Sequence, residues 1–200
     1  MGRSNIVDKK AIFLDRDGVI NKNVYYEDTK EWESPRILDD FHLIDNVISS
    51  LKILQENDYH FFIVTNQPSY AKGKTTLENL EEIISHTVRL LEKDNIKIQK
   101  VYCSFKHEKS IYKDYLTPCN LRKPNIGALM DAKDKFQINL NQSWMIGDRD
   151  TDIECGLNAG TKTIKISPYE DSKNIKADYN VSSLKEASVK ILSDDTFLDR

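Results

Sequence analysis

Two aspartates one residue apart end an otherwise apolar stretch near the start of the chain. The segment AIFLDRDGVIN, residues 11–21, runs from four apolar residues directly into Asp15, Arg16, Asp17 and Gly18. On an extended chain residues i and i+2 share a side, so we expect Asp15 and Asp17 together and Arg16 on the opposite side. Because neighbouring carboxylates repel, this spacing favours a shared proton or a cation between them. A polar turn entering solvent through Gly18 is the alternative interpretation.

Other segments, at the ends of expected strands or just before an expected helix, also carry groups that could serve one reaction. VTNQ ends with a hydroxyl and an amide that can hydrogen-bond phosphate oxygens, LRKPN offers two cations, and GDRDTD offers carboxylates. Taken singly, each is also typical of a turn or a helix start. Their common position at strand ends favours a shared site. The candidate residues from these segments are Thr65, Asn66, Arg122, Lys123, Asp148 and Asp152.

Two alternating periodicities describe the elements that must position these residues. Short apolar or β-rich runs favour strands buried on both faces of a parallel sheet, at residues 11–14, 61–66, 99–104, 143–148 and 161–167. Apolar residues at helical spacing predict helices at about 44–54, 77–91, 125–136, 151–158 and 182–192, with a frayed tail at 193–200. Thr75 and Glu78 have capping-box spacing, and Gly160 is expected to close the fourth helix.

Strands that alternate with helices predict an α/β fold, a doubly wound parallel sheet flanked by helices, with residues 1–200 as one domain. Residues 22–40 and 105–121 show no clear period, and both follow expected strands. Open α/β sheets bind ligands beyond the carboxyl ends of their strands, so these two segments are expected to be substrate loops. The intervals between the motifs are too short for a large cap domain.

Composition limits the classes of partner. A formal charge of −3 and a pI near 5.9 disfavour nucleic-acid binding, which requires a basic surface. The chain has no long apolar run for a membrane helix, and the start, MGRSNIVDKK, is too polar for a signal peptide. Three cysteines indicate a reducing compartment, so we expect a cytoplasmic protein. The sequence does not determine the oligomeric state, and a monomer is the default expectation.

The segments FLDRDGVIN, VTNQ, RKP and GDRDTD resemble, in this order, the four motifs of the haloacid dehalogenase (HAD) superfamily of phosphatases. They are most similar to the branch of heptose-bisphosphate and histidinol-phosphate phosphatases, over residues 11–166. The resemblance implies a Mg²⁺-dependent phosphomonoester hydrolase that acts on a small phosphorylated metabolite, above all a phosphosugar such as a heptose bisphosphate. The alternatives are histidinol phosphate, a nucleic-acid end, or a non-catalytic phospho-ligand binding protein of the same fold.

The resemblance also implies roles for individual residues. Asp15 would be the nucleophile that forms an aspartyl-phosphate, and Asp17 the general acid and base. The Mg²⁺ ligands would be Asp15, the backbone carbonyl of Asp17, and Asp148, with Asp152 in support. Phosphate would be held by Thr65, Asn66 and Lys123. Arg122 would grip the rest of the substrate, or lie in solvent as a surface arginine. Arg16 has no role in this scheme.

The chain departs from the branch at its zinc loop, which usually has the pattern Cys-x-His … Cys-x-Cys. Cys103 and Cys119 match two ligands, but Phe105 and Leu121 stand where the others belong. His107 could supply a third ligand, whereas structural zinc takes four. We therefore expect no zinc here. The loop would instead be held by packing of Phe105, Ile111, Tyr112, Tyr115 and Leu116.

A second departure follows VTNQ, where the segment PSYAKGK begins with Pro68 and so lacks one backbone donor. Tyr70, Lys72 and Lys74 remain as possible substrate contacts. Within residues 22–40, the aromatic side chains could wall a sugar ring or simply cover the sheet edge. They are Tyr25, Tyr26 and Trp32.

Overall fold

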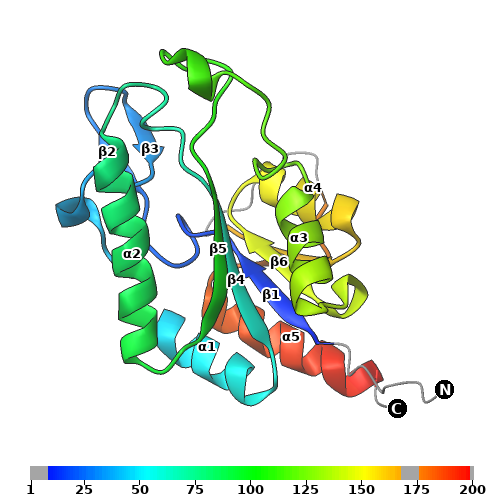
Figure 1. The fold of residues 1–200 in the computed structure, drawn as a ribbon. Coiled ribbons are helices and arrows are strands. Elements are labelled where there is room, and N and C mark those ends of the chain that lie inside the picture. Colours follow the sequence, from blue (N-terminus) through cyan, green and yellow to red (C-terminus); the bar gives the residue numbers. More distant parts are fainter. Residues whose placement is uncertain (1–8, 168–175, 199–200) are drawn as a thin grey trace.

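A six-stranded parallel sheet forms the centre of the molecule in a computed structural model, which describes residues 9–167 and 176–198 (Figure 1). The strand order is β5-β4-β1-β6-β7-β8, and every neighbouring pair is parallel. The strands are β1 (Ala11–Leu14), β4 (His60–Asn66), β5 (Ile98–Ser104), β6 (Trp144–Gly147), β7 (Lys162–Ile166) and β8 (Tyr179–Val181). The predicted α/β fold is confirmed. The sequence did not indicate β8, which has only three residues.

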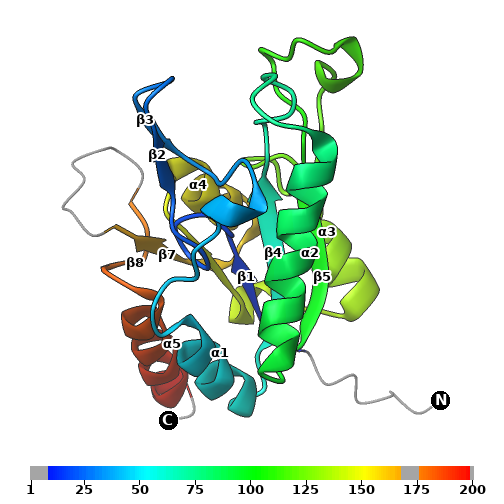
Figure 2. The ribbon, with the colours of Figure 1, turned by 90° about the vertical axis from the view of Figure 1, so that its left-hand side faces the viewer.

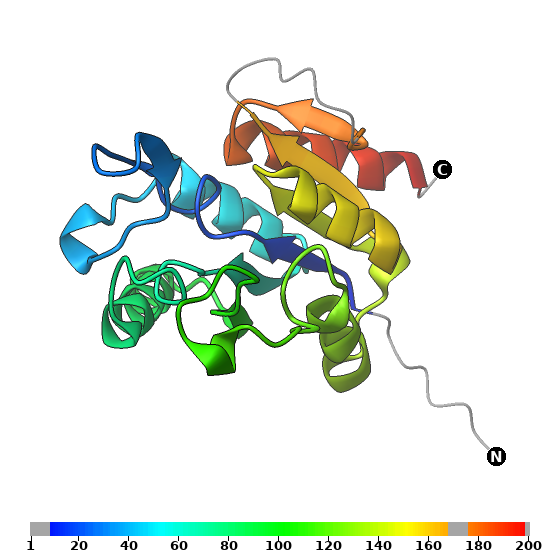
Figure 3. The same cartoon turned by 90° about the horizontal axis from the view of Figure 1, so that it is seen from above.

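Helices cover both faces of this sheet, which explains why its strands are apolar without alternation. In β1, Ile12 and Leu14 face one core layer, and Ala11 and Phe13 face the other. The first layer packs against α1 and α5, with Leu91 of α2; the second packs against α3 and α4 (Figure 3). The helices are α1 (Val47–Glu56), α2 (Leu77–Lys93), α3 (Gly127–Phe136), α4 (Asp150–Ala159) and α5 (Leu184–Leu198).

The strand order reverses at β1, and this reversal determines where a site can form. From β1 the chain moves outward to β4 and β5, then returns to the other side of β1 as β6. At such a switch point the loops leave in opposite directions, which opens a crevice beyond the carboxyl ends of the strands. Asp15 directly follows β1, and Asp148 directly follows β6.

Two segments stand beyond the carboxyl ends of the central strands (Figures 1 and 2). One is an antiparallel hairpin of β2 (Val24–Tyr26) and β3 (Glu31–Glu33), followed by the 3-10 turn η1 (Leu38–Asp40). The other is the loop after β5, which contains η2 (Lys113–Tyr115). A third 3-10 turn, η3 (Leu140–Gln142), precedes β6. Across residues 9–167 and 176–198 no large cap domain interrupts the sheet, as predicted.

Some local predictions were wrong. The residue that caps α2 is Thr76, whose hydroxyl accepts a hydrogen bond from the Asn79 backbone N–H, so the capping box at Thr75 does not form. Helix α5 continues to Leu198 through most of the tail that was expected to fray. Gly160 does close α4, with a positive φ of 83°.

The sequence predicts that the chain has no membrane-spanning helix, and the helices of the described residues test this prediction. None of these helices combines the length and apolar composition needed to cross a lipid bilayer. Residues 1–8, on which the expectation about a signal peptide depends, lie outside the described part of the chain.

Candidate active site

Carboxylates from three positions converge at the switch point. Asp15 and Asp148 lie close because β1 and β6 are paired, with Leu14 opposite Ile146. Asp152 joins them from the first turn of α4. Carboxylate oxygens of Asp15, Asp148 and Asp152 all lie within 4.8 Å of one another. This is closer than three anions would lie without a compensating charge.

Two glycines make this convergence possible. Gly18 has a φ of +81°, and a Cβ there would lie 2.3 Å from a carboxylate oxygen of Asp148. A Cβ on Gly147 would lie 2.2 Å from a carboxylate oxygen of Asp152. Any side chain at either position would therefore displace a carboxylate of the cluster.

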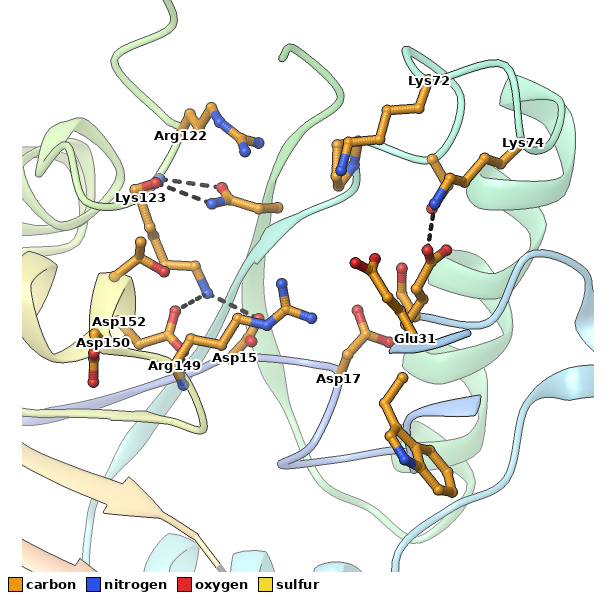
Figure 4. A pocket seen from close by; sticks show the side chains of 17 residues that line it. Asp15, Asp17, Glu31, Lys72, Lys74, Arg122, Lys123, Arg149, Asp150 and Asp152 are labelled. Carbon is orange, nitrogen blue, oxygen red and sulfur yellow. Dashed lines mark hydrogen bonds and ion pairs between the residues drawn. The ribbon is translucent and has the colours of Figure 1, made fainter. Parts of the chain in front are cut away.

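Lys123 supplies a buried positive charge to the cluster. Its Nζ lies 2.8 Å from Oδ1 of Asp15 and 2.7 Å from Oδ1 of Asp152, and it donates to the Val64 carbonyl at 2.6 Å. Burial lowers the pKa of the ammonium, but the two carboxylates outweigh burial, so the pKa lies above its usual range. Lys123 is thus held in its charged form between the two aspartates (Figure 4).

Asn66 fixes the backbone of this lysine. Its side-chain amide donates to the Lys123 carbonyl at 3.0 Å and accepts from the Lys123 backbone N–H at 3.1 Å. Thr65, by contrast, is fully buried, and its hydroxyl accepts a hydrogen bond from Gln67 at 2.7 Å. Of these two candidates for phosphate binding, Asn66 lines the cavity above the cluster and Thr65 does not.

The single positive charge of Lys123 does not balance the negative charge of the three clustered carboxylates. Burial raises the pKa of Asp15 to about 7 against the opposing effect of Lys123, and the neighbouring carboxylates raise it further. Burial, then Asp152, raises the pKa of Asp148 to about 6. In addition, Oδ1 of Asp148 is buried and accepts no hydrogen bond within the described residues. Hard oxygen donors with excess negative charge fit a divalent cation such as Mg²⁺.

Arg16 does not point away from Asp17, as the strand geometry predicted. The chain turns at Gly18, and the Arg16 guanidinium folds back onto Asp17. Its Nη2 donates to Oδ1 at 2.8 Å and to Oδ2 at 3.1 Å, and its Nε donates to Oδ1 at 3.1 Å. Arg16 is almost fully buried, which makes this ion pair part of the core.

Two amides complete the surroundings of Asp17. Asn21 donates to Oδ1 at 2.9 Å, and Gln67 donates to Oδ2 at 2.6 Å. Together with Arg16 they hold the Asp17 carboxylate in one orientation at the cavity wall. The sequence assigns no role to Gln67, although it lies within the VTNQ segment. Its position directly after Asn66 was the available signal.

A cavity of about 280 Å³ opens above these groups, and five cationic side chains line it together with six carboxylates (Figure 4). Lys72, Lys74, Arg122 and Arg149 line it together with Lys123. Lys74 forms an ion pair with Glu33 on the hairpin. The Lys72 ammonium and the Arg122 guanidinium form neither a hydrogen bond nor an ion pair with the residues described, and Nη1 of Arg122 is buried. Sequence reasoning missed Arg149, although it directly follows Asp148.

The three possible zinc ligands do not share a position. Among the described residues, Asp15, Asp148 and Asp152 form the group that could hold a metal, and Cys103, His107 and Cys119 form no such group. Cys103 pairs with Thr65 between β5 and β4, where burial raises the pKa of its thiol to about 12. Nδ1 of His107 accepts a hydrogen bond from the Lys109 backbone at 3.0 Å.

Aromatic side chains hold the loop after β5 against the loop after β4. Tyr70 stacks on Tyr112 at 4.7 Å and meets Tyr115 edge-on at 5.0 Å. The Ile111 backbone N–H donates to the Ala71 carbonyl at 2.8 Å. Packing was predicted for this loop, but Ile111 is largely exposed, and Tyr70 packs against the loop instead of lining the cavity.

Comparisons with known proteins identify the family of this chain. A family model described as HAD-hydrolase-like matches residues 120–187. A D-glycero-alpha-D-manno-heptose-1,7-bisphosphate 7-phosphatase from Campylobacter jejuni is 32% identical over 157 residues, which cover 78% of this chain and 80% of that relative. A D-glycero-beta-D-manno-heptose-1,7-bisphosphate 7-phosphatase from Escherichia coli K12 is 29% identical over 180 residues, or 88% and 90% of the two chains.

A solved structure is also similar. The D,D-heptose 1,7-bisphosphate phosphatase from B. bronchiseptica, complexed with magnesium and phosphate, matches with a TM-score of 0.72 at 19% identity, over 92% of this chain and 99% of that one. At this identity the structural match shows the fold. The sequence match to the Campylobacter jejuni relative shows the family. This chain therefore belongs to the HAD superfamily of phosphatases, in the branch that includes the D-glycero-D-manno-heptose-1,7-bisphosphate 7-phosphatases.

Proposed function

We propose that this phosphatase removes one phosphate from a heptose bisphosphate or a closely related phosphosugar, through an aspartyl-phosphate on Asp15. The observation that carries the proposal is the position of Asp15. Asp15 lies at the end of β1 and forms an ion pair with Lys123. It lines a cavity whose walls also carry the cationic side chains Lys72 and Arg122. Histidinol-phosphate phosphatase remains the rival within the class.

The reaction has two steps. A carboxylate oxygen of Asp15 attacks phosphorus, the bond from phosphorus to the sugar oxygen breaks, and Asp17 gives a proton to the departing oxygen. Asp17 then takes a proton from water as the water attacks the aspartyl-phosphate, which releases phosphate, restores the Asp15 carboxylate and returns Asp17 to its protonated form. Lys123 is placed to neutralise the phosphoryl oxygens throughout, at a fixed point that needs no reorganisation.

Mg²⁺ fits the carboxylates that are present. We propose that Asp15, the backbone carbonyl of Asp17, and Asp148 hold the ion, with Asp152 in support. The support for this is the cluster itself and the buried Oδ1 of Asp148, which accepts no hydrogen bond within the described residues and meets only the Arg149 guanidinium, at 3.9 Å. When bound, the ion offsets the negative charge of the carboxylates and of the transferring phosphoryl group.

The two unpaired cations favour a substrate with a second anionic group. Arg122 and Lys72 line the cavity, and neither cationic group forms a hydrogen bond or ion pair with the described residues, so a second phosphate could supply one. A heptose bisphosphate carries such a group. Histidinol phosphate carries an amine instead, which these cations would repel. The relatives named above act on bisphosphates, which supports the same choice.

The experiment is a phosphate-release assay with Mg²⁺ on heptose 1,7-bisphosphates of both anomers, histidinol phosphate and a 3′-phosphorylated oligonucleotide. We expect the bisphosphates to be preferred, and Asp15→Asn to lower turnover by roughly 10⁴-fold or more. Unchanged turnover in Asp15→Asn would exclude the mechanism. Tight binding without any turnover in the wild type would instead indicate a non-catalytic binding protein.

The single domain over residues 1–200, the monomeric state and the cytoplasmic location stay predictions.

A further inference from the structure

The two carboxylate oxygens of Asp148 have different surroundings. Oδ2 accepts a hydrogen bond from the side-chain amide of Asn23 at 3.2 Å. It also lies against Gly18, where a Cβ would come within 2.3 Å of it. Oδ1 is buried and accepts no hydrogen bond within the described residues, with the Arg149 guanidinium 3.9 Å away. Oδ2 is therefore engaged by the protein, whereas Oδ1 is available to a cation.

Asn23 uses only one end of its amide for this contact. An ionised carboxylate can only accept hydrogen bonds, so Asn23 presents its NH2 group to Asp148. The other end, Oδ1 of Asn23, is buried and accepts no hydrogen bond within the described residues. Buried polar atoms without a protein partner are commonly satisfied by an ordered water. Because Mg²⁺ keeps several waters when it binds to a protein, an ion at the carboxylate cluster would bring water close to Asn23.

The backbone that leads to Asn23 is fixed. The Ile44 N–H donates to the Ile20 carbonyl at 2.9 Å, and the Lys22 N–H donates to the His42 carbonyl at 2.8 Å. Strand β2 of the hairpin begins directly after Asn23. A side chain on a backbone held in this way can orient a metal ligand with little freedom of its own.

A second asparagine of the same segment makes the same type of contact. Asn21 donates to Oδ1 of Asp17 at 2.9 Å, as Asn23 donates to Oδ2 of Asp148. The two acids follow different strands, since Asp17 comes after β1 and Asp148 after β6. One short segment therefore orients carboxylates that come from two neighbouring strands.

We propose that Asn23 is a positioning residue for the Mg²⁺ ligand Asp148: its NH2 group holds Oδ2 and leaves Oδ1 as the ligand oxygen. This role rests on the Mg²⁺ site proposed above. Asn23 acts through Asp148 and takes no part in bond breaking. Hydrogen bonds to a carboxylate that binds a metal fix its orientation, and the loss of such a partner typically lowers metal affinity roughly 10- to 100-fold.

Calorimetric titration of the metal-free protein with Mg²⁺ tests this role without any turnover. We expect Asn23→Ala to raise the Kd for Mg²⁺ roughly 10- to 100-fold. Asn23→Leu has a similar volume but neither polar group, and the same rise is expected. Asn180→Ala removes an exposed asparagine of β8 and is the matched control, which should leave the Kd unchanged.

Activity at two Mg²⁺ concentrations separates positioning from a structural role. At a concentration near the wild-type Kd, Asn23→Ala should lose most of its phosphate release, because few molecules then hold the ion. At a concentration roughly 100-fold higher, most of the release should return. The loss should be equal on a heptose bisphosphate and on acetyl phosphate, which has neither a sugar ring nor a second phosphate, because the ion serves every substrate alike.

Three outcomes would overturn the role of Asn23. The first is an unchanged Kd in both variants while the wild type binds Mg²⁺, which leaves the proposed function intact. The second is a loss of activity that excess Mg²⁺ does not restore, or variants that do not fold, either of which indicates a structural role. The third is a loss on the bisphosphate alone, which would make Asn23 a sugar contact. If the wild type binds no Mg²⁺, the proposed metal site itself fails.

Discussion

The floor and the walls of the cavity are built in different ways. We call Asp15, Lys123, Asp148 and Asp152 the floor: Asp15, Lys123 and Asp152 line the cavity, and Asp148 adjoins them in the carboxylate cluster. They are positioned by the paired strands, by Asn66 at the end of β4 and by the start of α4. Each makes short contacts or lies within one tight cluster. The walls come from the hairpin and the two loops after β4 and β5. They carry side chains that form no hydrogen bond or ion pair with the residues the structure describes, such as Lys72, Glu31 and Arg122.

This difference separates two tasks. Groups that make or break bonds must be held to within a fraction of an ångström, and a packed sheet does this well. Groups that select a substrate need only face the cavity with unsatisfied polar or apolar surface. We therefore expect changes on the floor to affect every substrate alike, and changes on the walls to affect one class of substrate.

Asp148→Asn tests the floor. Of the three substitutions Asp148→Asn, Arg16→Ala and Arg122→Ala, we expect it to have the largest effect on activity. Activity should fall for all substrates by more than the ~10- to 100-fold typical of losing an outer partner of a metal ion. In the folded chain the pKa of Asp148 is raised to about 6, so ionisation at neutral pH opposes folding without a cation. The metal-free variant should therefore unfold at the same temperature as the wild type or higher.

The measurement is thermal unfolding with and without Mg²⁺. Wild type should be stabilised by Mg²⁺, because a ligand that binds only the folded state raises the unfolding temperature. Asp148→Asn should lose most of this rise. A full Mg²⁺ response in the variant would contradict the assigned metal site.

Arg16→Ala tests whether the ion pair with Asp17 positions the general acid. Sugar-phosphate turnover should fall about 100-fold, the lower end of what general acid catalysis contributes. p-Nitrophenyl phosphate, whose leaving group needs no proton, should be affected much less. Arg16→Lys keeps the positive charge but loses the bidentate contact with Asp17, and we expect its sugar-phosphate turnover to lie between that of the wild type and that of Arg16→Ala. Equal losses on both substrates would mean that Arg16 supports only the fold.

Arg122→Ala tests the walls and has the smallest expected effect. KM for a bisphosphate should rise roughly 10-fold, as expected when one hydrogen bond to a charged group of about 1.5–3 kcal/mol is lost. Acetyl phosphate turnover should change little. Lys109→Ala, an exposed cation of the same loop outside the cavity lining, is the control. An equal loss of activity on the bisphosphate and on acetyl phosphate would contradict this assignment, because it would mean that Arg122 acts on every substrate as the floor residues do.

The same division explains what the sequence could predict. The floor follows from local rules: apolar strands, carboxylates at their ends, and the topology of a parallel sheet bring Asp15, Lys123 and Asp148 together. The exception is Arg16. Strand alternation predicts its direction only while the chain stays extended, and the turn at Gly18 ends that geometry.

The hairpin could not be predicted because its turn lacks the usual residues. A tight hairpin is signalled by Asn-Gly or Asp-Gly, whereas here Lys30 takes the positive φ, at 55°. Its stability comes from Arg36, which follows the hairpin and folds back onto it. Such contacts form only in the folded chain.

The most direct test of the mechanism is to trap the phosphate on the enzyme. Asp17→Asn should slow the release of the aspartyl-phosphate, because it removes the base that activates water. Acid quenching during turnover, followed by mass spectrometry of the peptides, should find one phosphoryl group on Asp15. Turnover with no phosphoryl group on Asp15, or with one on another residue, would contradict the account.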